Sequence, residues 1–122
     1  MALPSGMTLA KISENIGPTG ARTIFSGTGT YTAANFPVSV AEGLGYTPNY
    51  VRFINLTDRV TMEQFVDAAL DGGSNAKGLK QVAAGTGTYE ATGLVVTAKT
   101  VTVTVATALL TDNDDFILIC ER

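Results

Sequence analysis

The sequence predicts a mainly β protein, either an antiparallel β-sandwich or a partly open barrel with an extended N-terminal arm. Residues 100–105 alternate threonine and valine, the period of a strand that buries one face. Residues 116–120 are apolar on both faces, which predicts a strand that is central in its sheet or covered by another subunit. Short β-prone runs elsewhere are separated by glycine-rich and polar segments. These three observations together favour an all-antiparallel β fold.

The first half of the chain predicts several short strands. Residues 22–25 and 31–36 are β-prone, and the glycine-rich segment 26–30 between them predicts a turn or bulge. Residues 38–48 predict a loop that contains a brief strand. Residues 50–56 are rich in β-formers and end at a polar reversal, so we expect a strand there.

The next segment has two interpretations. Residues 60–66 would return as a strand antiparallel to the preceding one. Alternatively, Thr61 and Gln64 match a capping box, and residues 62–70 would then form one short amphipathic helix. The strand is favoured, because β-branched and aromatic residues are poor helix formers in so short a segment.

A pentapeptide, Gly-Thr-Gly-Thr-Tyr, occurs at residues 27–31 and again at residues 85–89. Each copy follows an apolar segment, which suggests two equivalent turns. Neither copy is followed by the Gly-Lys-Ser/Thr of a phosphate-binding loop, so we expect β-turns and no nucleotide site. Residues 72–78 predict a mobile, exposed loop tip by their composition.

A chain of 122 residues is long enough for one core, so one domain is expected. Proline and glycine punctuate residues 1–20, which predicts an N-terminal arm that leads into a single β domain over residues 21–122. An arm of this kind is either frayed or docked on a neighbour. Its apolar side chains are the candidate partner-binding residues, namely Leu3, Met7, Leu9, Ile12 and Ile16.

The composition predicts a protein that functions in contact with other proteins. Only 16% of the residues are charged, against about 25% in typical soluble domains. Threonine, glycine, alanine and asparagine take their place, and a polar uncharged surface is less costly to desolvate than an ionised one. The net charge is −3 and the eight cationic residues are scattered, so we expect neither nucleic acid nor an anionic membrane as a partner.

The N-terminal segment lacks the continuous apolar core of a signal peptide, and no stretch has the roughly 18 apolar residues of a membrane span. We therefore expect synthesis in a reducing cytoplasm. The single cysteine, Cys120, follows two apolar residues, so we expect it to be buried and inert.

The chemical inventory argues against an enzyme. The chain contains no histidine, which is the commonest general base and the commonest zinc ligand. One cysteine is too few for thiolate metal sites. The sequence therefore predicts no catalytic residues, no cofactor and no metal.

The acidic residues at positions 112–115 leave one alternative from a different class. Asp112, Asp114 and Asp115 offer the hard oxygen ligands that Ca²⁺ prefers, so a calcium-binding lectin-like module or a small hydrolase is conceivable. The segment lacks the spacing and the terminal glutamate of an EF-hand. A solvated turn between two strands is the favoured interpretation, because Asp and Asn stabilise chain reversals.

Residues 51–63, Val-Arg-Phe-Ile-Asn-Leu-Thr-Asp-Arg-Val-Thr-Met-Glu, and residues 78–86, Gly-Leu-Lys-Gln-Val-Ala-Ala-Gly-Thr, resemble small virion structural proteins of tailed bacteriophages. The chain looks most like the capsid decoration, or cement, proteins. The resemblance implies a β-rich and often trimeric protein on the outside of the head, bound to the major capsid protein after synthesis in the host cytoplasm. A phage tail, fibre or baseplate component that touches the host surface is the alternative.

Overall fold

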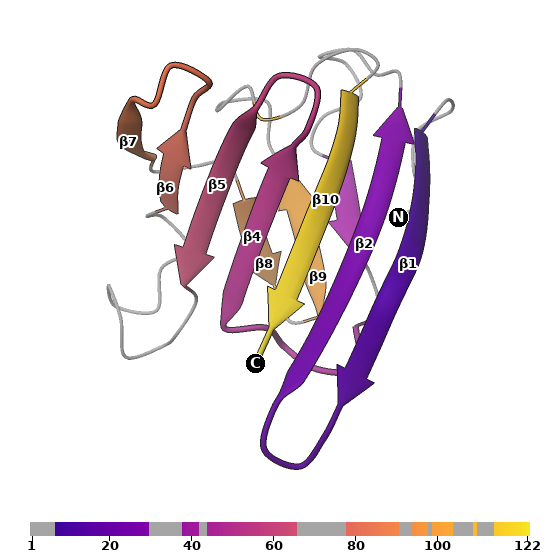
Figure 1. Ribbon diagram of the computed structural model, residues 1–122. Helices are drawn as coiled ribbons and strands as arrows, with labels where there is room; N and C mark the ends of the chain where they lie inside the picture. Colours follow the sequence, from indigo (N-terminus) through magenta and orange to yellow (C-terminus); the bar gives the residue numbers. More distant parts are fainter. Residues whose placement is uncertain are drawn as a thin grey trace.

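The computed structural model describes residues 7–29, 38–41, 44–65, 78–90, 94–97, 99–103, 109 and 114–122. Within these ranges the chain forms two antiparallel sheets that face each other (Figure 1). The larger sheet has seven strands and does not close into a barrel, and the smaller one has three. The prediction of a mainly β, antiparallel, sandwich-like fold is confirmed.

In the seven-stranded sheet, strands from the two ends of the chain are neighbours. Its strands are β1 (Met7–Ile16), β2 (Ala21–Gly29), β10 (Asp114–Glu121), β4 (Tyr50–Asn55), β5 (Val60–Phe65), β6 (Gly78–Gln81) and β7 (Gly87–Glu90). The three-stranded sheet contains β3 (Val38–Ala41), β9 (Thr100–Val103) and β8 (Leu94–Thr97), in that order.

Strand β10 is central in the larger sheet, as its apolar sequence predicted. It pairs antiparallel with β2 on one side and with β4 on the other, so that Leu118 lies opposite both Phe25 and Phe53. Phe116 and Cys120 share the buried face with Leu118, and none of the three is more than 1% exposed. The last β segment of the chain therefore joins two parts of the sequence that are far apart.

The core fills the space between the two sheets. Phe53 and Phe116 stack with their ring centroids 5.1 Å apart, and both are buried. The smaller sheet contributes Val101 and Val103 of β9, which are completely buried. This confirms the predicted alternation of β9 over residues 100–103, while Val105 lies outside the described residues. Within the described ranges the core also contains Ala21, Phe25, Leu44, Tyr46, Val51, Val60, Met62, Leu94, Val96, Leu109, Leu118 and Cys120.

Residues 60–65 form strand β5, so the strand interpretation of this segment is confirmed. Val60, Met62 and Gln64 are buried, and the residues between them are more exposed. This alternation has the period of a strand with one face on the core. Strand β5 pairs with β4 along its whole length, so its backbone groups have hydrogen-bond partners on the neighbouring strand. An isolated helix of this length would be only marginally stable in water. Residues 66–70 lie outside the described residues.

The two copies of the Gly-Thr-Gly-Thr-Tyr repeat have different structures, so the prediction of two equivalent turns is wrong. The first copy begins within β2, and a Cβ atom on Gly27 would clash with the Phe116 ring. The second copy begins in the turn between β6 and β7, where Gly85 has a φ of +85°. One glycine makes room for a core ring, and the other supplies a left-handed turn conformation.

The N-terminal segment differs from the expected arm from residue 7 onward. Strand β1 pairs antiparallel with β2 over Met7–Ile16, with a bulge between Lys11 and Ser13. The expected boundary at residue 20 lies in the β1–β2 hairpin, where the Gly17 N–H donates to the Gly20 carbonyl at 2.8 Å. Pairing with β1 satisfies the backbone groups along the second edge of β2, which an undocked arm would leave open. Residues 1–6 lie outside the described residues.

Candidate partner-binding surface

The described members of the predicted partner-binding set, Leu9, Ile12 and Ile16, differ in their surroundings. Leu9 packs against the core. Ile12 lies at the bulge of β1 and is 60% exposed, and Ile16 at the end of the strand is 48% exposed. Leu3 lies outside the described residues, and so does the side chain of Met7. Ile12 and Ile16 are therefore the two members of the predicted set that a partner could reach on the described part of β1.

A second apolar region lies on the outer face of the seven-stranded sheet, which is the face turned away from the three-stranded sheet. Strand register places four isoleucines side by side there. Ile119 of β10 lies opposite Ile24 of β2, and Ile117 of β10 lies opposite Ile54 of β4. All four are half-buried. We call Ile24, Ile54, Ile117 and Ile119 the isoleucine cluster.

The position of this cluster is unusual for a face of a sandwich that is not covered by the second sheet. Such faces are normally polar, because one side of an antiparallel sheet packs on the core and the other is solvated. Because residues 116–120 are apolar on both faces, the sequence indicated two members of the cluster, Ile117 and Ile119. Ile24 and Ile54 could be assigned to it only when the strand order was known.

Polar and aromatic groups border the cluster toward the C-terminal end of β10. Arg22 Nε lies 3.8 Å from Glu121 Oε1. The Tyr50 hydroxyl donates to Glu63 Oε2 at 2.7 Å. The Tyr50 and Phe65 rings meet at a tilted angle with centroids 5.0 Å apart, and Phe65 is 63% exposed. An apolar centre with a polar and aromatic border is the usual anatomy of a protein–protein interface.

A shallow apolar groove of about 390 Å³ continues the cluster toward the edge strand. Ala10, Ser26 and Thr28 line it, and they lie on the outer face by register. Ile117 and the 51%-exposed Leu56 contribute the larger side chains. The groove exists because the side chains over β2 are small, so it could receive an apolar side chain from a partner.

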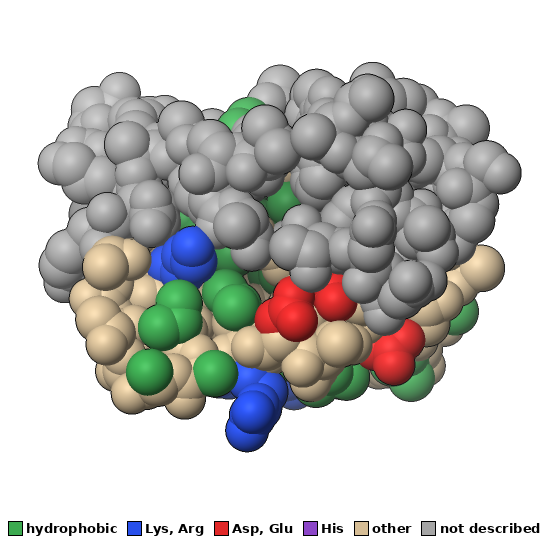
Figure 2. Space-filling model, turned by 90° about the horizontal axis from the view of Figure 1, so that it is seen from above, with side chains coloured by type: hydrophobic (Ala, Val, Ile, Leu, Met, Phe, Trp, Pro, Cys, Tyr) green, Lys and Arg blue, Asp and Glu red, His purple; other side chains and the backbone are tan. Residues whose placement is uncertain are grey.

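Charge is mixed over the described surface at the end of the sheet that carries the β4–β5 turn. Figure 2 shows hydrophobic, acidic and basic side chains close together on the described residues there, without a block of one sign. A nucleic-acid site would need clustered cations. The described residues on this face show no such cluster.

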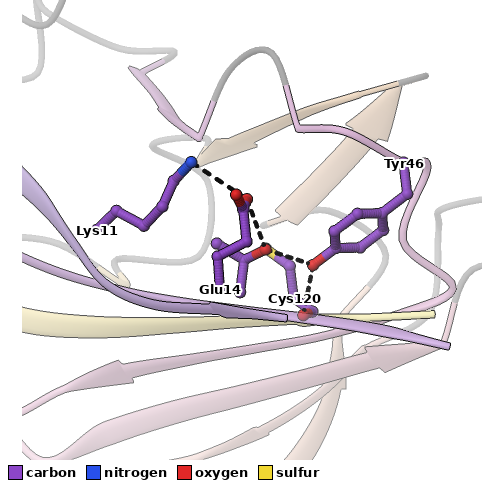
Figure 3. A network of polar contacts seen from close by, with 5 residues as sticks. Lys11, Glu14, Tyr46 and Cys120 are labelled. Carbon is purple, nitrogen blue, oxygen red and sulfur yellow. Dashed lines mark hydrogen bonds and ion pairs between the residues drawn. The ribbon is translucent and has the colours of Figure 1, made fainter. Parts of the chain in front are cut away.

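A network of polar contacts on the opposite, inner side holds β1, β2 and β10 to the segment after β3 (Figure 3). Lys11 Nζ lies 3.1 Å from Glu14 Oε2, which also accepts a hydrogen bond from Thr23 Oγ1 at 3.3 Å. The Tyr46 hydroxyl lies 2.8 Å from both Thr23 Oγ1 and the Cys120 carbonyl oxygen, and its single proton is shared between them. The network anchors the chain around Tyr46 to three strands.

Burial disfavours the charged forms of the Tyr46 phenol and of the nearby Cys120 thiol. Loss of solvation raises the pKa of the Tyr46 phenol above its ordinary value. Burial also raises the pKa of the Cys120 thiol to about 12. The predicted burial of Cys120 is confirmed, since the residue is 0% exposed. Neither pKa shift favours an anion at neutral pH, and the hydrogen bonds of the network join β1, β2 and β10 to the segment around Tyr46.

The described part of the acidic segment, Asp114 and Asp115, forms the start of strand β10 and not the solvated turn that was predicted. Asp114 is buried and accepts a hydrogen bond from Asn55 Nδ2 at 2.7 Å. Asp115 is exposed, and its backbone N–H donates to Thr57 Oγ1 at 2.9 Å. Asp112 and Asn113 lie outside the described residues. No group of three or more metal-ligating side chains occurs in the described ranges.

The comparisons with known proteins leave the chain without a family assignment. No family model matches the sequence, and neither a curated protein nor a solved structure shows a significant match. Among the described residues, no helix has the length and apolar character to cross a membrane.

Proposed function

We propose that this protein is a capsid decoration, or cement, protein of a tailed bacteriophage. It would bind the major capsid protein on the outer surface of the head and stabilise the shell by protein–protein contacts, without catalysis. The observation that carries the proposal is the isoleucine cluster in the middle of the outer face. A solvated sheet face gains nothing from such a cluster, whereas a docked one buries it.

The energetics of a lattice suit such a surface. Complete burial of an isoleucine side chain contributes about 1.5–3 kcal/mol, and the four isoleucines start half-buried, so one contact of this kind is of modest strength. Many copies on one shell raise the overall strength of attachment through effective concentration. The low charge of the chain reduces the desolvation cost at each contact.

Assembly with other copies belongs to the same proposal. Decoration proteins of the type that the sequence resembles are often trimers, and we propose a homotrimer here. Strand β1 is one edge of the larger sheet, opposite β7, and it exposes Ile12 and Ile16. We propose that these two side chains contact a neighbouring copy or the capsid.

Occupancy on undecorated heads of the cognate phage tests the proposal. The double variant Ile117→Thr/Ile119→Thr keeps β-branched residues in β10 but removes apolar surface from the outer face. We expect its occupancy to fall at least about tenfold. The matched control is Val95→Thr on β8, a half-buried residue of the other sheet. Its occupancy should equal that of the unmodified protein.

Two results would contradict the proposal. The first is that the unmodified protein shows no saturable binding to heads. The second is that labelled protein on intact particles is found on the tail. The second result would favour the tail, fibre or baseplate alternative. The single variants Ile12→Ser and Ile16→Ser, measured in the same way, test the contribution of β1 without removing a strand.

A further inference from the structure

We propose that Arg52, on the outer face beside the isoleucine cluster, is the anchor for a carboxylate side chain of the partner protein. The inference rests on the proposed function, because it names what the partner brings to the same surface. The occupant is an extended protein segment that carries an Asp or Glu between apolar residues.

The first step is the state of the Arg52 side chain. Its Nε atom is shielded by atoms of this chain and has no hydrogen-bond acceptor among the described residues, while the residue as a whole is only half-buried and so within reach of a partner. A buried donor without an acceptor costs about 1–3 kcal/mol, and more when the group is charged. Native proteins rarely leave such a donor unpaired, so an unpaired one calls for a specific explanation.

The second step is that the carboxylates next to Arg52 are already engaged. Glu63 lies opposite Arg52 across the β4–β5 pair, but its Oε2 accepts the hydrogen bond from Tyr50. Glu121, on the neighbouring β10, lies against Arg22. The guanidinium of Arg52 makes no ion pair with a carboxylate of the described residues. Glu63 is the nearest carboxylate across the strand pair, yet Arg52 Nε is left without an acceptor at this point of the face.

The third step is where this charge lies. Register places Arg52 opposite Ile119 of β10, and Ile54 lies two residues further along the same face of β4. An arginine set among apolar side chains is the composition of an interface hot spot. The planar guanidinium can bind both oxygens of one carboxylate, which gives the contact direction as well as strength. A lysine at this position would lack that geometry.

The fourth step fixes the chemistry of the occupant. Alternate residues of an extended segment point to the same side. A segment that places a Glu over Arg52 can therefore place apolar residues, two positions before and after it, over the isoleucine cluster. We use the blocked peptide acetyl-Val-Thr-Glu-Thr-Val-amide as the probe. The matched control peptide replaces its Glu with Gln, which keeps the shape and removes the charge.

The first measurement follows the full-length protein by NMR during peptide titration. The Arg52 Nε–H signal and the methyl signals of Ile54 and Ile119 should shift and saturate with the Glu peptide. The dissociation constant for the Gln peptide should be at least about tenfold weaker. In Arg52→Gln the difference between the peptides should disappear. Equal affinity of the two peptides for the unmodified protein would overturn the inference.

Glu63→Gln tests the internal explanation that Glu63 pairs with Arg52 in solution. The inference expects the Arg52 Nε–H shift of the free protein to change little in this variant, and the preference for the Glu peptide to persist. A large change in that shift, together with loss of the peptide preference, would show that Glu63 is the carboxylate that Arg52 serves. That result would overturn the inference.

The second measurement uses undecorated heads and separates this inference from the proposed function. Arg52→Gln should lower occupancy at least about tenfold, while Lys99→Gln, which alters an exposed lysine between β8 and β9 of the other sheet, should change it less than about twofold. Urea unfolding of both variants checks that the fold is intact. If the unmodified protein binds heads and the two variants bind equally well, the inference fails and the proposed function stands.

If the unmodified protein does not bind heads, the proposed function fails, and the peptide titration alone decides whether Arg52 is a carboxylate site. Sedimentation of the free protein tests the other possible occupant. Self-association that Arg52→Gln abolishes would place a second copy on this face and overturn the assignment to a separate partner.

Discussion

The two faces of strand β10 carry similar apolar side chains but have different surroundings. On the inner face, Phe116, Leu118 and Cys120 are buried under the three-stranded sheet. On the outer face, Ile117 and Ile119 are only half-buried by their neighbours in the same sheet. The comparison teaches that one strand can serve two purposes. Its inner side chains stabilise the fold, and its outer side chains are those that we propose a partner contacts.

The largest effect that tests this comparison is expected from two phenylalanines on adjacent strands. Phe53 of β4 is completely buried against Phe116, whereas Phe65 of β5 is on the outer face and 63% exposed. Phe53→Ala should lower the free energy of unfolding by about 3–5 kcal/mol, because it removes a core ring and leaves a cavity. Phe65→Ala should lower it by less than about 1 kcal/mol. Urea unfolding measures both, and equal losses would refute the distinction between the faces.

A smaller effect is expected when a methyl group is added on the inner side. Gly27→Ala places a Cβ against the Phe116 ring and 2.8 Å from the Thr8 carbonyl oxygen. We expect a loss of about 1–3 kcal/mol in the free energy of unfolding, because the core has no room to relax. Gly87→Ala is the control, since its nearest neighbour would be 3.6 Å away. A neutral Gly27→Ala, in thermal or urea unfolding, would show that the ring can move aside.

The inner face also predicts a dependence on alkaline pH. Burial raises the pKa of the Cys120 thiol from 9.0 to about 12, so the folded state holds a proton that the unfolded state loses above about pH 9. The stability gained by keeping the thiol neutral is therefore complete below pH 9 and is lost as the pH rises toward 12. Between pH 7.5 and pH 10, the free energy of unfolding should fall more for the unmodified protein than for Cys120→Ala. Parallel curves would contradict the assignment.

The smallest effect on stability is expected on the outer face. Ile119→Thr keeps a β-branched residue in β10 and changes only half-buried surface. We expect the free energy of unfolding to change by less than about 1 kcal/mol. Leu118→Ala, one residue away on the inner face, should cost about 2–5 kcal/mol. If Ile119→Thr costs as much as Leu118→Ala, the outer face is part of the stabilising core.

The fold could be predicted largely from local patterns. The alternation over residues 100–103, the apolar run of β10 and the polar reversal after β4 each identify a strand or a turn from neighbouring residues alone. The edge strand β1 is predicted as an arm from local sequence, because prolines and glycines flank it on both sides and its pairing with β2 has no local signal. The repeated pentapeptide was misleading for a related reason. Its first copy is shaped by Phe116, which lies far away in the sequence.

The candidate site could be predicted only in part. The sequence indicated that β10 has a second apolar face, but not what lies beside it. The isoleucine cluster requires β2, β10 and β4 to be neighbours, and chain order places them far apart. The exceptional position of Arg52 could not be found from its sequence neighbours, which are those of an ordinary strand. It depends on the fold, which brings Glu63 to the Tyr50 hydroxyl and Glu121 to Arg22.

The sequence by itself determined the alternation of β9 and the absence of histidine and of a second cysteine, because these depend on residue type and on spacing within a few positions. The tertiary structure decided which apolar residues became core and which became the outer face. A strand presents both sides equally, and only the packing of a second sheet against one of them makes the two faces different.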